Sequence, residues 1–238
     1  VAGQLDGSTF NVGPLLNAGI RYRGANVEWR NVLTFKYVIS KTPLLEEWVK
    51  SQDQLYFESM VLYRLTSAQW FAPYALINLD TPVSPGGDFR PNDVDYHIVG
   101  RGEADETVVG RKLDLTDAFA PLQLRQAVGA MMNPVDEEYA KLEFRVGVGA
   151  RETFVQLGQV VTETKPDVGT DGRDLVEVKR LEDFQQVGGE AYAGIGGVVT
   201  FESLGKDRPL IYGASVDVMI PFYSSIDNGK TLVDLTNV

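Results

Sequence analysis

The most constraining feature of the sequence is a strict alternation of apolar and polar residues between Phe10 and Tyr22. Every even position in this stretch is apolar, and the odd positions between them are mostly small or polar. A period of two residues indicates a β-strand with one apolar face. At 13 residues it exceeds the usual strand of about 5–6 residues in globular sheets. The chain is therefore expected to fold into long, two-faced strands.

The same alternation recurs along the rest of the chain. Further strands are expected over residues 27–39, 54–64, 70–79, 122–132, 141–149, 190–203 and 210–222, and another begins near Thr231. The fold class that this pattern predicts is all-β and antiparallel.

The connections between these strands alternate in length. Tight turns are expected at 24–26, 66–68, 134–138 and 205–208, with long polar loops at about 40–53, 80–120 and 155–188. Short turns at one end and long loops at the other are typical of an outer-membrane barrel. We therefore expect a single domain over 1–238, an up-and-down transmembrane β-barrel of about 10–12 strands in the full protein.

The order of the turns has a consequence for both ends of the chain. If the first tight turn is periplasmic, Val1 lies outside the cell, whereas such barrels normally begin and end in the periplasm. Val238 falls within the last expected strand, and the terminal aromatic residue typical of such barrels is missing. We therefore expect further strands before Val1 and after Val238.

Composition excludes several classes of function. Cysteine is absent, which excludes disulfides and thiolate metal sites. The net charge of −11 opposes binding to nucleic acid. No run approaches the 18 apolar residues of a transmembrane helix, but a barrel strand needs only about 9–11 residues. No cofactor is expected.

The polar face of the strands carries charges of both signs that would point into the barrel lumen. These residues are Arg21, Glu28, Arg30, Lys36, Glu58, Arg64, Arg125, Lys141, Glu143, Arg145 and Asp217. They would either line a solute-selective channel or pair across a narrow, filled interior. The expected strand number favours the filled or narrow interior, because wide aqueous channels need about 16–18 strands.

Aromatic residues lie near strand ends, as expected for two girdles at the membrane interfaces. The girdle residues are Tyr22, Trp29, Tyr37, Tyr63, Trp70, Tyr212 and Phe222. The alternative is ordinary core packing in a soluble β-protein.

Catalytic and metal sites have little support in the sequence. His97 is the only histidine and falls in a polar segment, so neither a zinc site nor a catalytic triad is expected, and the protein is predicted not to be an enzyme. Asp167, Asp171 and Asp174 form a weak calcium candidate. Gly169 and Val178 occupy two positions where a calcium loop needs ligands, so a solvated loop is favoured.

Several short motifs resemble a family of uncharacterised bacterial outer-membrane β-barrel proteins, known as a domain of unknown function. The motifs are Asn17 to Tyr22, Trp29 to Leu33, Lys41 to Leu55, Leu115 to Pro121, Val128-Gly129, Asn133-Pro134, Arg151 to Phe154 and Leu210 to Tyr212. The resemblance implies an outer-membrane barrel with strands flanking both ends of this region. It implies no activity, ligand or catalytic residue.

These observations predict a non-enzymatic protein of the bacterial outer membrane, either a structural or scaffold component or a narrow path for solutes. Its expected partners are outer-membrane lipid and, through the long loops, other envelope proteins. The alternative is a soluble lipocalin-like barrel in which the apolar face points inward around a small apolar ligand. Alternation alone does not show which face of the strands is in contact with water.

Overall fold

The computed structural model describes residues 8–43, 47–68, 70–100, 104–137, 139–155, 158–166, 168–199 and 210–225. Within these ranges the chain is almost entirely β-strand, with one short 3-10 turn at Thr170–Gly172. The expected all-β, antiparallel fold class is therefore confirmed. No helix of the described residues is long and apolar enough to cross a membrane.

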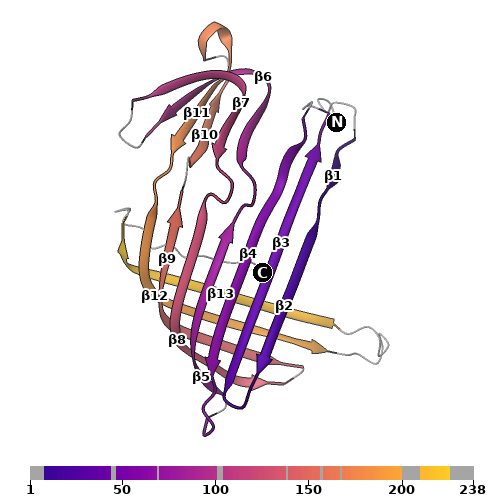
Figure 1. Cartoon of the computed structure of the whole chain (residues 1–238), viewed down its shortest axis with the longest axis vertical. Coiled ribbons are helices and arrows are strands. Elements are labelled where there is room, and N and C mark those ends of the chain that lie inside the picture. Colours follow the sequence, from indigo (N-terminus) through magenta and orange to yellow (C-terminus); the bar gives the residue numbers. More distant parts are fainter. Residues whose placement is uncertain are drawn as a thin grey trace.

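Most strands belong to one large antiparallel sheet, which Figure 1 shows as a strongly twisted wall. Along the wall, the order is β1 or β2, then β3, β4, β5, β8, β9, β12 and β13. Their bounds are β1 Phe10–Val12, β2 Leu15–Arg23, β3 Val27–Lys41, β4 Val49–Tyr63, β5 Phe71–Thr81, β8 Leu122–Asp136, β9 Lys141–Phe154, β12 Phe184–Val199 and β13 Leu210–Ser224.

The strand expected from Phe10 to Tyr22 runs along β3 in one register, with a single break. Phe10 faces Lys41 and Leu15 faces Lys36, so β1 and β2 continue one another. The break falls at Gly13-Pro14 because proline has no N–H to donate to the ladder. The Tyr37 N–H still donates to the Pro14 carbonyl at 3.1 Å.

The prediction of long loops at 80–120 and 155–188 is wrong in detail, because both segments form β-hairpins. β6 (Gly86–Val99) pairs with β7 (Glu106–Thr116), and β10 (Gln159–Lys165) pairs with β11 (Leu175–Arg180). The two hairpins join through a parallel β6–β11 ladder into a second sheet of order β10-β11-β6-β7. The expected loop at 40–53 is likewise shorter, since β3 ends at Lys41 and β4 begins at Val49.

A small core of its own holds the second sheet together. Val94, Tyr96 and Ile98 of β6 pack against Val176 and Val178 of β11, all of them buried. Both hairpins leave the large sheet at the same end, shown at the top of Figure 1. We call this the hairpin end. At the opposite end lie the tight turns after β2, β4 and β8, so we call it the short-turn end.

The large sheet curls strongly, and in Figure 1 β12 and β13 cross the direction of β2, β3 and β4 at a steep angle. Glycines on the inner face permit this curl where strands approach closely. A Cβ added to Gly129 would lie 2.1 Å from the carbonyl oxygen of Val146 on β9. Within the described residues β2 and β13 are paired on one side only, so the sheet does not close into a barrel there. The strand expected near Thr231 lies outside the described residues.

Candidate functional site: the concave face of the large sheet

One face of the large sheet collects the eleven charges singled out in the sequence. Ladder partners share a face, and Arg21 faces Arg30, Arg145 faces Tyr192 and Tyr192 faces Asp217. Alternation along each strand places Glu28, Lys36, Glu58, Arg125, Lys141 and Glu143 on the same face. Arg64 follows β4 and joins them through its side chain.

Glu28 lies at the centre of the first charged cluster and is fully buried. Its carboxylate accepts hydrogen bonds from Nε of Arg21 at 2.5 Å, of Arg30 at 2.6 Å and of Arg64 at 3.0 Å. Arg23 Nε lies 3.5 Å away. Four guanidinium groups thus surround one carboxylate, which satisfies the buried charge of Glu28 and leaves the cluster positive.

Arg30 links this cluster to the far side of the sheet. Its Nη1 lies 3.3 Å from Glu143 Oε2 on β9, although β4, β5 and β8 stand between β3 and β9. In a flat sheet the axes of β3 and β9 would lie about 19 Å apart. The contact requires the sheet to bend toward this face, so the charged face is concave.

A second charged cluster lies on β8, β12 and β13. Arg125 donates Nε to Glu190 at 2.8 Å and Nη1 to Asp217 at 2.6 Å, and its Nη2 reaches both carboxylates. Each carboxylate is therefore held by two N–H groups of one guanidinium. Gly149 makes room for Glu190, since a Cβ there would lie 2.4 Å from Glu190 Oε1.

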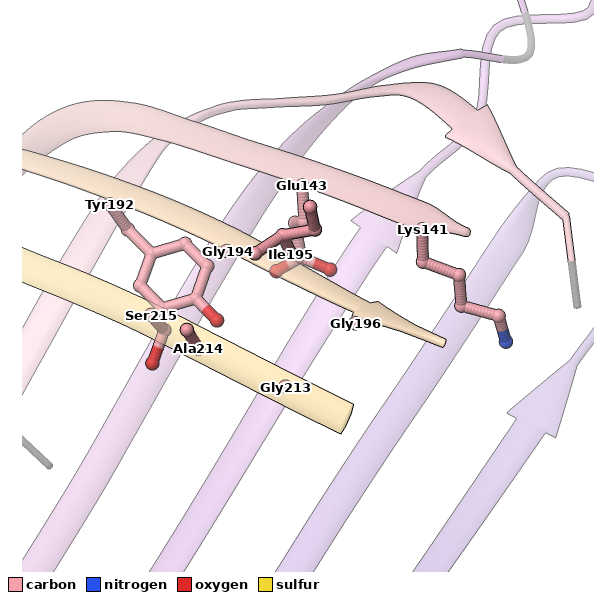
Figure 2. Close-up of a pocket in the computed structure, with 9 residues that line it drawn as sticks. All are labelled: Lys141, Glu143, Tyr192, Gly194, Ile195, Gly196, Gly213, Ala214 and Ser215. Atoms are coloured by element: carbon pink, nitrogen blue, oxygen red, sulfur yellow. The ribbon is translucent and has the colours of Figure 1, made fainter. Parts of the chain in front are cut away.

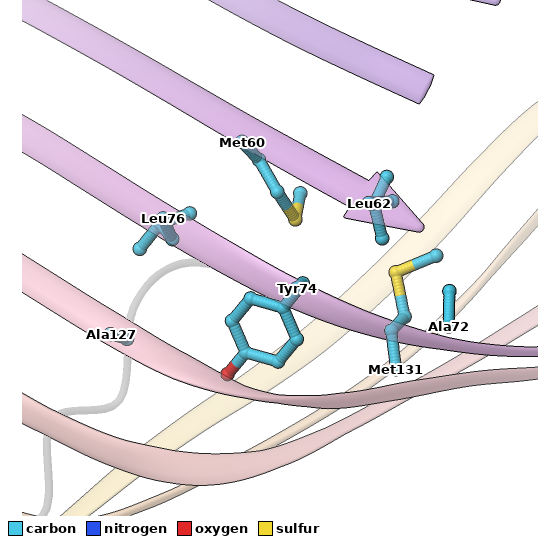
Figure 3. Close-up of a cluster of buried hydrophobic side chains, with 7 residues drawn as sticks. All are labelled: Met60, Leu62, Ala72, Tyr74, Leu76, Ala127 and Met131. Atoms are coloured by element: carbon cyan, nitrogen blue, oxygen red, sulfur yellow. The ribbon is translucent and has the colours of Figure 1, made fainter. Parts of the chain in front are cut away.

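An apolar cluster shares the concave face with these charges. Figure 3 shows its side chains, which come from β4, β5 and β8. The residues are Met60, Leu62, Ala72, Tyr74, Leu76, Ala127 and Met131, all buried. This cluster was not predicted from the sequence, because the whole inner face was expected to be polar. The apolar side chains at even positions of β4 and β5 were the signal for it.

A cavity of about 330 Å³ lies on this face, near the end of β12 and the starts of β9 and β13. Lys141, Glu143, Tyr192 and Ser215 line it with polar groups, as Figure 2 shows. Its other lining residues include Gly194, Gly196 and Gly213, which leave the strand backbone bare. The Arg145 guanidinium carbon lies 3.7 Å from the centre of the Tyr192 ring, a stacked cation–π contact.

Lys36 and Glu58 lie nearer the middle of the concave face. Glu58 accepts a hydrogen bond from the Tyr56 hydroxyl at 2.8 Å, and Lys36 faces Leu15 and Gln54 in the ladders. The expected charged residues thus fall into two bonded clusters with Lys36, Glu58 and Lys141 outside them. Tyr192 and Glu190 were missed, because the glycine-rich β12 hides its alternation.

The opposite, convex face is mostly apolar and largely exposed, with Asn31, Ser59 and Gln126 as polar residues among its apolar side chains. Ile20 and Phe222 each leave 70% of their surface exposed, and Val148 at mid-strand leaves 52%. The six expected aromatic residues that lie in strands are all on this face by alternation, namely Tyr22, Trp29, Tyr37, Tyr63, Tyr212 and Phe222. Trp70 precedes β5 and is also exposed. Tyr37 and Phe222 lie toward the hairpin end, and the others toward the short-turn end.

The weak calcium candidate does not form a metal site among the described residues. Asp167 lies outside them, and Asp171 is exposed with its carboxylate 3.6 Å from the Arg173 guanidinium. Arg173 Nε instead donates to the buried Asp95 at 2.6 Å, and the Thr170 N–H donates to the same carboxylate at 2.5 Å. A guanidinium therefore occupies the position that a cation would need.

Asp95 is held as an anion by these contacts. The hydrogen bond from Arg173, followed by that from the Thr170 N–H, keeps the pKa of Asp95 below its ordinary value. His97 lies within β6 rather than in a loop, with Nδ1 3.5 Å from Thr107 Oγ1 and Nε2 3.9 Å from Asp105. No group of metal-ligating side chains forms around it in the described part of the chain.

Part of the chain matches a known family. A family model described as a protein of unknown function (DUF3078) matches residues 4–86, which include β1 to β5. The resemblance seen at Asn17 to Tyr22, Trp29 to Leu33 and Lys41 to Leu55 lies inside this range. The match names no activity and no membrane. No curated protein and no solved structure matches the chain.

Proposed function

We propose that this chain forms the wall of an outer-membrane β-barrel with a largely filled interior and acts as a structural or scaffold component. The observation that carries the proposal is the division of the wall into an exposed apolar convex face and an ionic concave face. Soluble monomers rarely expose apolar patches above a few hundred Å². A face of this extent is suited to lipid.

Strand length and aromatic placement support the same proposal. Strands of 14–16 residues, such as β3, β4, β8, β9 and β12, exceed the 9–11 residues needed to cross a bilayer at a tilt. Aromatic residues stand toward both ends of the convex face, as interfacial girdles would. Closure of the wall into a barrel, through further strands between the free edges of β2 and β13, belongs to the proposal. The second sheet would then stand outside the bilayer on the hairpin side.

The direction of curvature argues against the lipocalin-like alternative. A soluble ligand-binding barrel needs its apolar residues on the concave face, around the ligand. Here the concave face carries Glu28, Arg125 and their partners, and its only apolar cluster in the described residues is packed. That packing also favours a filled interior over a wide channel. No step of the proposed role requires catalysis.

Membrane fractionation and heat-dependent gel mobility test the proposal together. We expect the chain to require detergent for extraction from envelopes, and to migrate faster on a gel without heating than after boiling. A chain that stays soluble without detergent and shows no such shift would contradict it. Planar-bilayer recording then separates a scaffold from a narrow path, since only the latter gives small, discrete conductance steps.

A further inference from the structure

The second sheet stands beyond the hairpin end of the wall without being hydrogen-bonded into it. In the described ranges, no strand of the second sheet pairs with a strand of the large sheet. Figure 1 shows the second sheet at the top, joined to the wall by the connections that enter and leave its two hairpins. The angle between the second sheet and the wall therefore depends on how firmly these connections are held.

The connection from β5 to β6 is short and stiff. It runs from Pro82 to Pro85, and β6 begins at the next residue, Gly86. The two prolines fix their φ angles at about −65° and leave the chain little freedom of direction. A contact that fixes this connection therefore also fixes the direction in which β6 leaves the wall.

Two side chains of β4, the neighbour of β5, bind this connection. Lys50 Nζ donates to Asp53 Oδ2 at 2.8 Å, to the Ser84 carbonyl at 2.9 Å and to the Pro85 carbonyl at 3.0 Å. All three N–H groups of the ammonium thus have acceptors. The Asp53 carboxylate also accepts from the Val83 N–H at 2.8 Å, and from the N–H and the hydroxyl of Ser84 at 2.9 and 2.6 Å. We call these two side chains and their contacts the clamp.

The clamp is an enclosed site and not a surface ion pair. The Asp53 side chain is 3% exposed, and that of Lys50 is 24% exposed. A buried carboxylate is stable only with partners of this kind, and removal of one partner leaves an uncompensated charge. The clamp also lies beyond Leu55 and Thr81, the last ladder pair of β4 and β5 at this end. It therefore holds the connection where the backbone ladder no longer does.

We propose that the clamp is a conformational latch that holds the second sheet at one angle to the wall. While it is closed, the start of β6 is fixed twice, by its covalent link to β5 and by the bonds from β4. When it is open, the second sheet keeps its own buried core and swings as a body on its connections. The latch does not depend on whether lipid or water covers the convex face.

Distance measurement between two spin labels tests the latch in the purified full chain. The chain has no cysteine, so Val109→Cys on β7 and Val128→Cys on β8 provide the only labelling sites, and both positions are exposed. We expect a single narrow distance distribution in this labelled parent. Lys50→Met and Asp53→Asn should each replace it with a broad distribution, because each removes the ion pair of the clamp.

Lys165→Met is the matched control, because the Lys165 ammonium pairs with Glu177 at 2.5 Å inside the second sheet. It should keep the narrow distribution. The latch would be overturned by a broad distribution in the parent, by an unchanged narrow one in Lys50→Met, or by equal broadening in the control.

Hydrogen exchange of residues 94–98 and 176–178 reports separately on the core of the second sheet. It should stay slow in Lys50→Met, because the sheet is expected to move without unfolding. Fast exchange there would also overturn the latch, since the clamp would then be required for folding and not for orientation. The measurements apply with or without detergent, so a soluble chain would contradict the proposed function and leave this test valid.

Discussion

Arg30 on β3 and Glu143 on β9 form an ion pair across the concave face, with Nη1 and Oε2 3.3 Å apart and three strands between them. No ladder hydrogen bond connects β3 to β9, so the pair depends on the curl of the whole sheet. Each side chain is about a quarter exposed. The pair is therefore a direct probe of curvature.

A double-mutant cycle with Arg30→Gln and Glu143→Gln should show a coupling energy of about 1 kcal/mol in the free energy of unfolding. The cycle is needed because Arg30 also bonds Glu28, and the single variant loses both contacts. Unfolding by urea, followed by tryptophan fluorescence, supplies the measurement. Lys36→Gln combined with Glu143→Gln is the control pair and should be additive. A coupling of zero would contradict a stabilising ion pair between Arg30 and Glu143.

The glycines of the inner face provide a second test of the curl. Gly129→Ala would place a Cβ 2.1 Å from the Val146 carbonyl oxygen, so β8 and β9 would have to separate. We expect a loss of about 1–3 kcal/mol in the free energy of unfolding, as for other overpacked sites. Gly189→Ala on β12 is the control because nothing lies within 4 Å of its added Cβ. That variant should be neutral or stabilised by up to about 1 kcal/mol. Equal effects would contradict the close approach.

The sequence predicted the sheet face of each side chain better than it predicted which side chains are in contact. Alternation assigned Arg21, Glu28 and Arg125 to one face and Trp29 and Phe222 to the other, because a strand's side-chain period is independent of its partners. It could not predict that Arg30 meets Glu143 or that Arg125 meets Glu190, since such contacts depend on strand order and curl. Local pattern also gave no signal for the parallel β6–β11 pairing, which joins segments far apart in the chain.

The second sheet was missed for a related physical reason. Val94, Tyr96 and Ile98 do alternate with Asp95 and His97, but the run is short and interrupted by polar residues. At Arg90 to Asp93 the β6–β7 register shifts around Pro91, which cannot donate to a ladder. Residues 80–120 were expected to form a loop because of that interruption. The apolar contacts that stabilise β6 come from partner strands, chiefly from Val176 and Val178 of β11 and also from Val108 of β7.

Acid should weaken the second sheet through Asp95. Because the pKa of Asp95 is held below its ordinary value, its ionised form stabilises the folded protein. That stabilisation is present above the ordinary value of about 3.9 and is lost as pH falls through the lower folded value. Hydrogen exchange of residues 94–99 and 175–180, corrected for intrinsic rates, should therefore accelerate at acid pH.

Asp95→Asn should remove most of this pH dependence and raise exchange in both segments already at neutral pH. The reason is that the amide cannot form the ion pair with Arg173, whose Nε lies 2.6 Å from the carboxylate. Asp171→Asn is the control, since that carboxylate is exposed and 3.6 Å from Arg173. If Asp171→Asn flattened the profile as much as Asp95→Asn, the assignment to Asp95 would be wrong.

The convex face offers the sharpest distinction between lipid and water. Val148 lies at the middle of β9 on this face and is 52% exposed. In a bilayer, Val148→Arg should make folding into phospholipid vesicles less favourable by about 2–4 kcal/mol, the cost of arginine near the midplane. Val160→Arg on β10 is the matched control, because Val160 is 40% exposed but belongs to the second sheet, outside the proposed bilayer. An exposed position in water tolerates such a change within about 0.5 kcal/mol. Equal, small effects at both positions would mean that water covers the convex face, and the membrane proposal would then have to be abandoned.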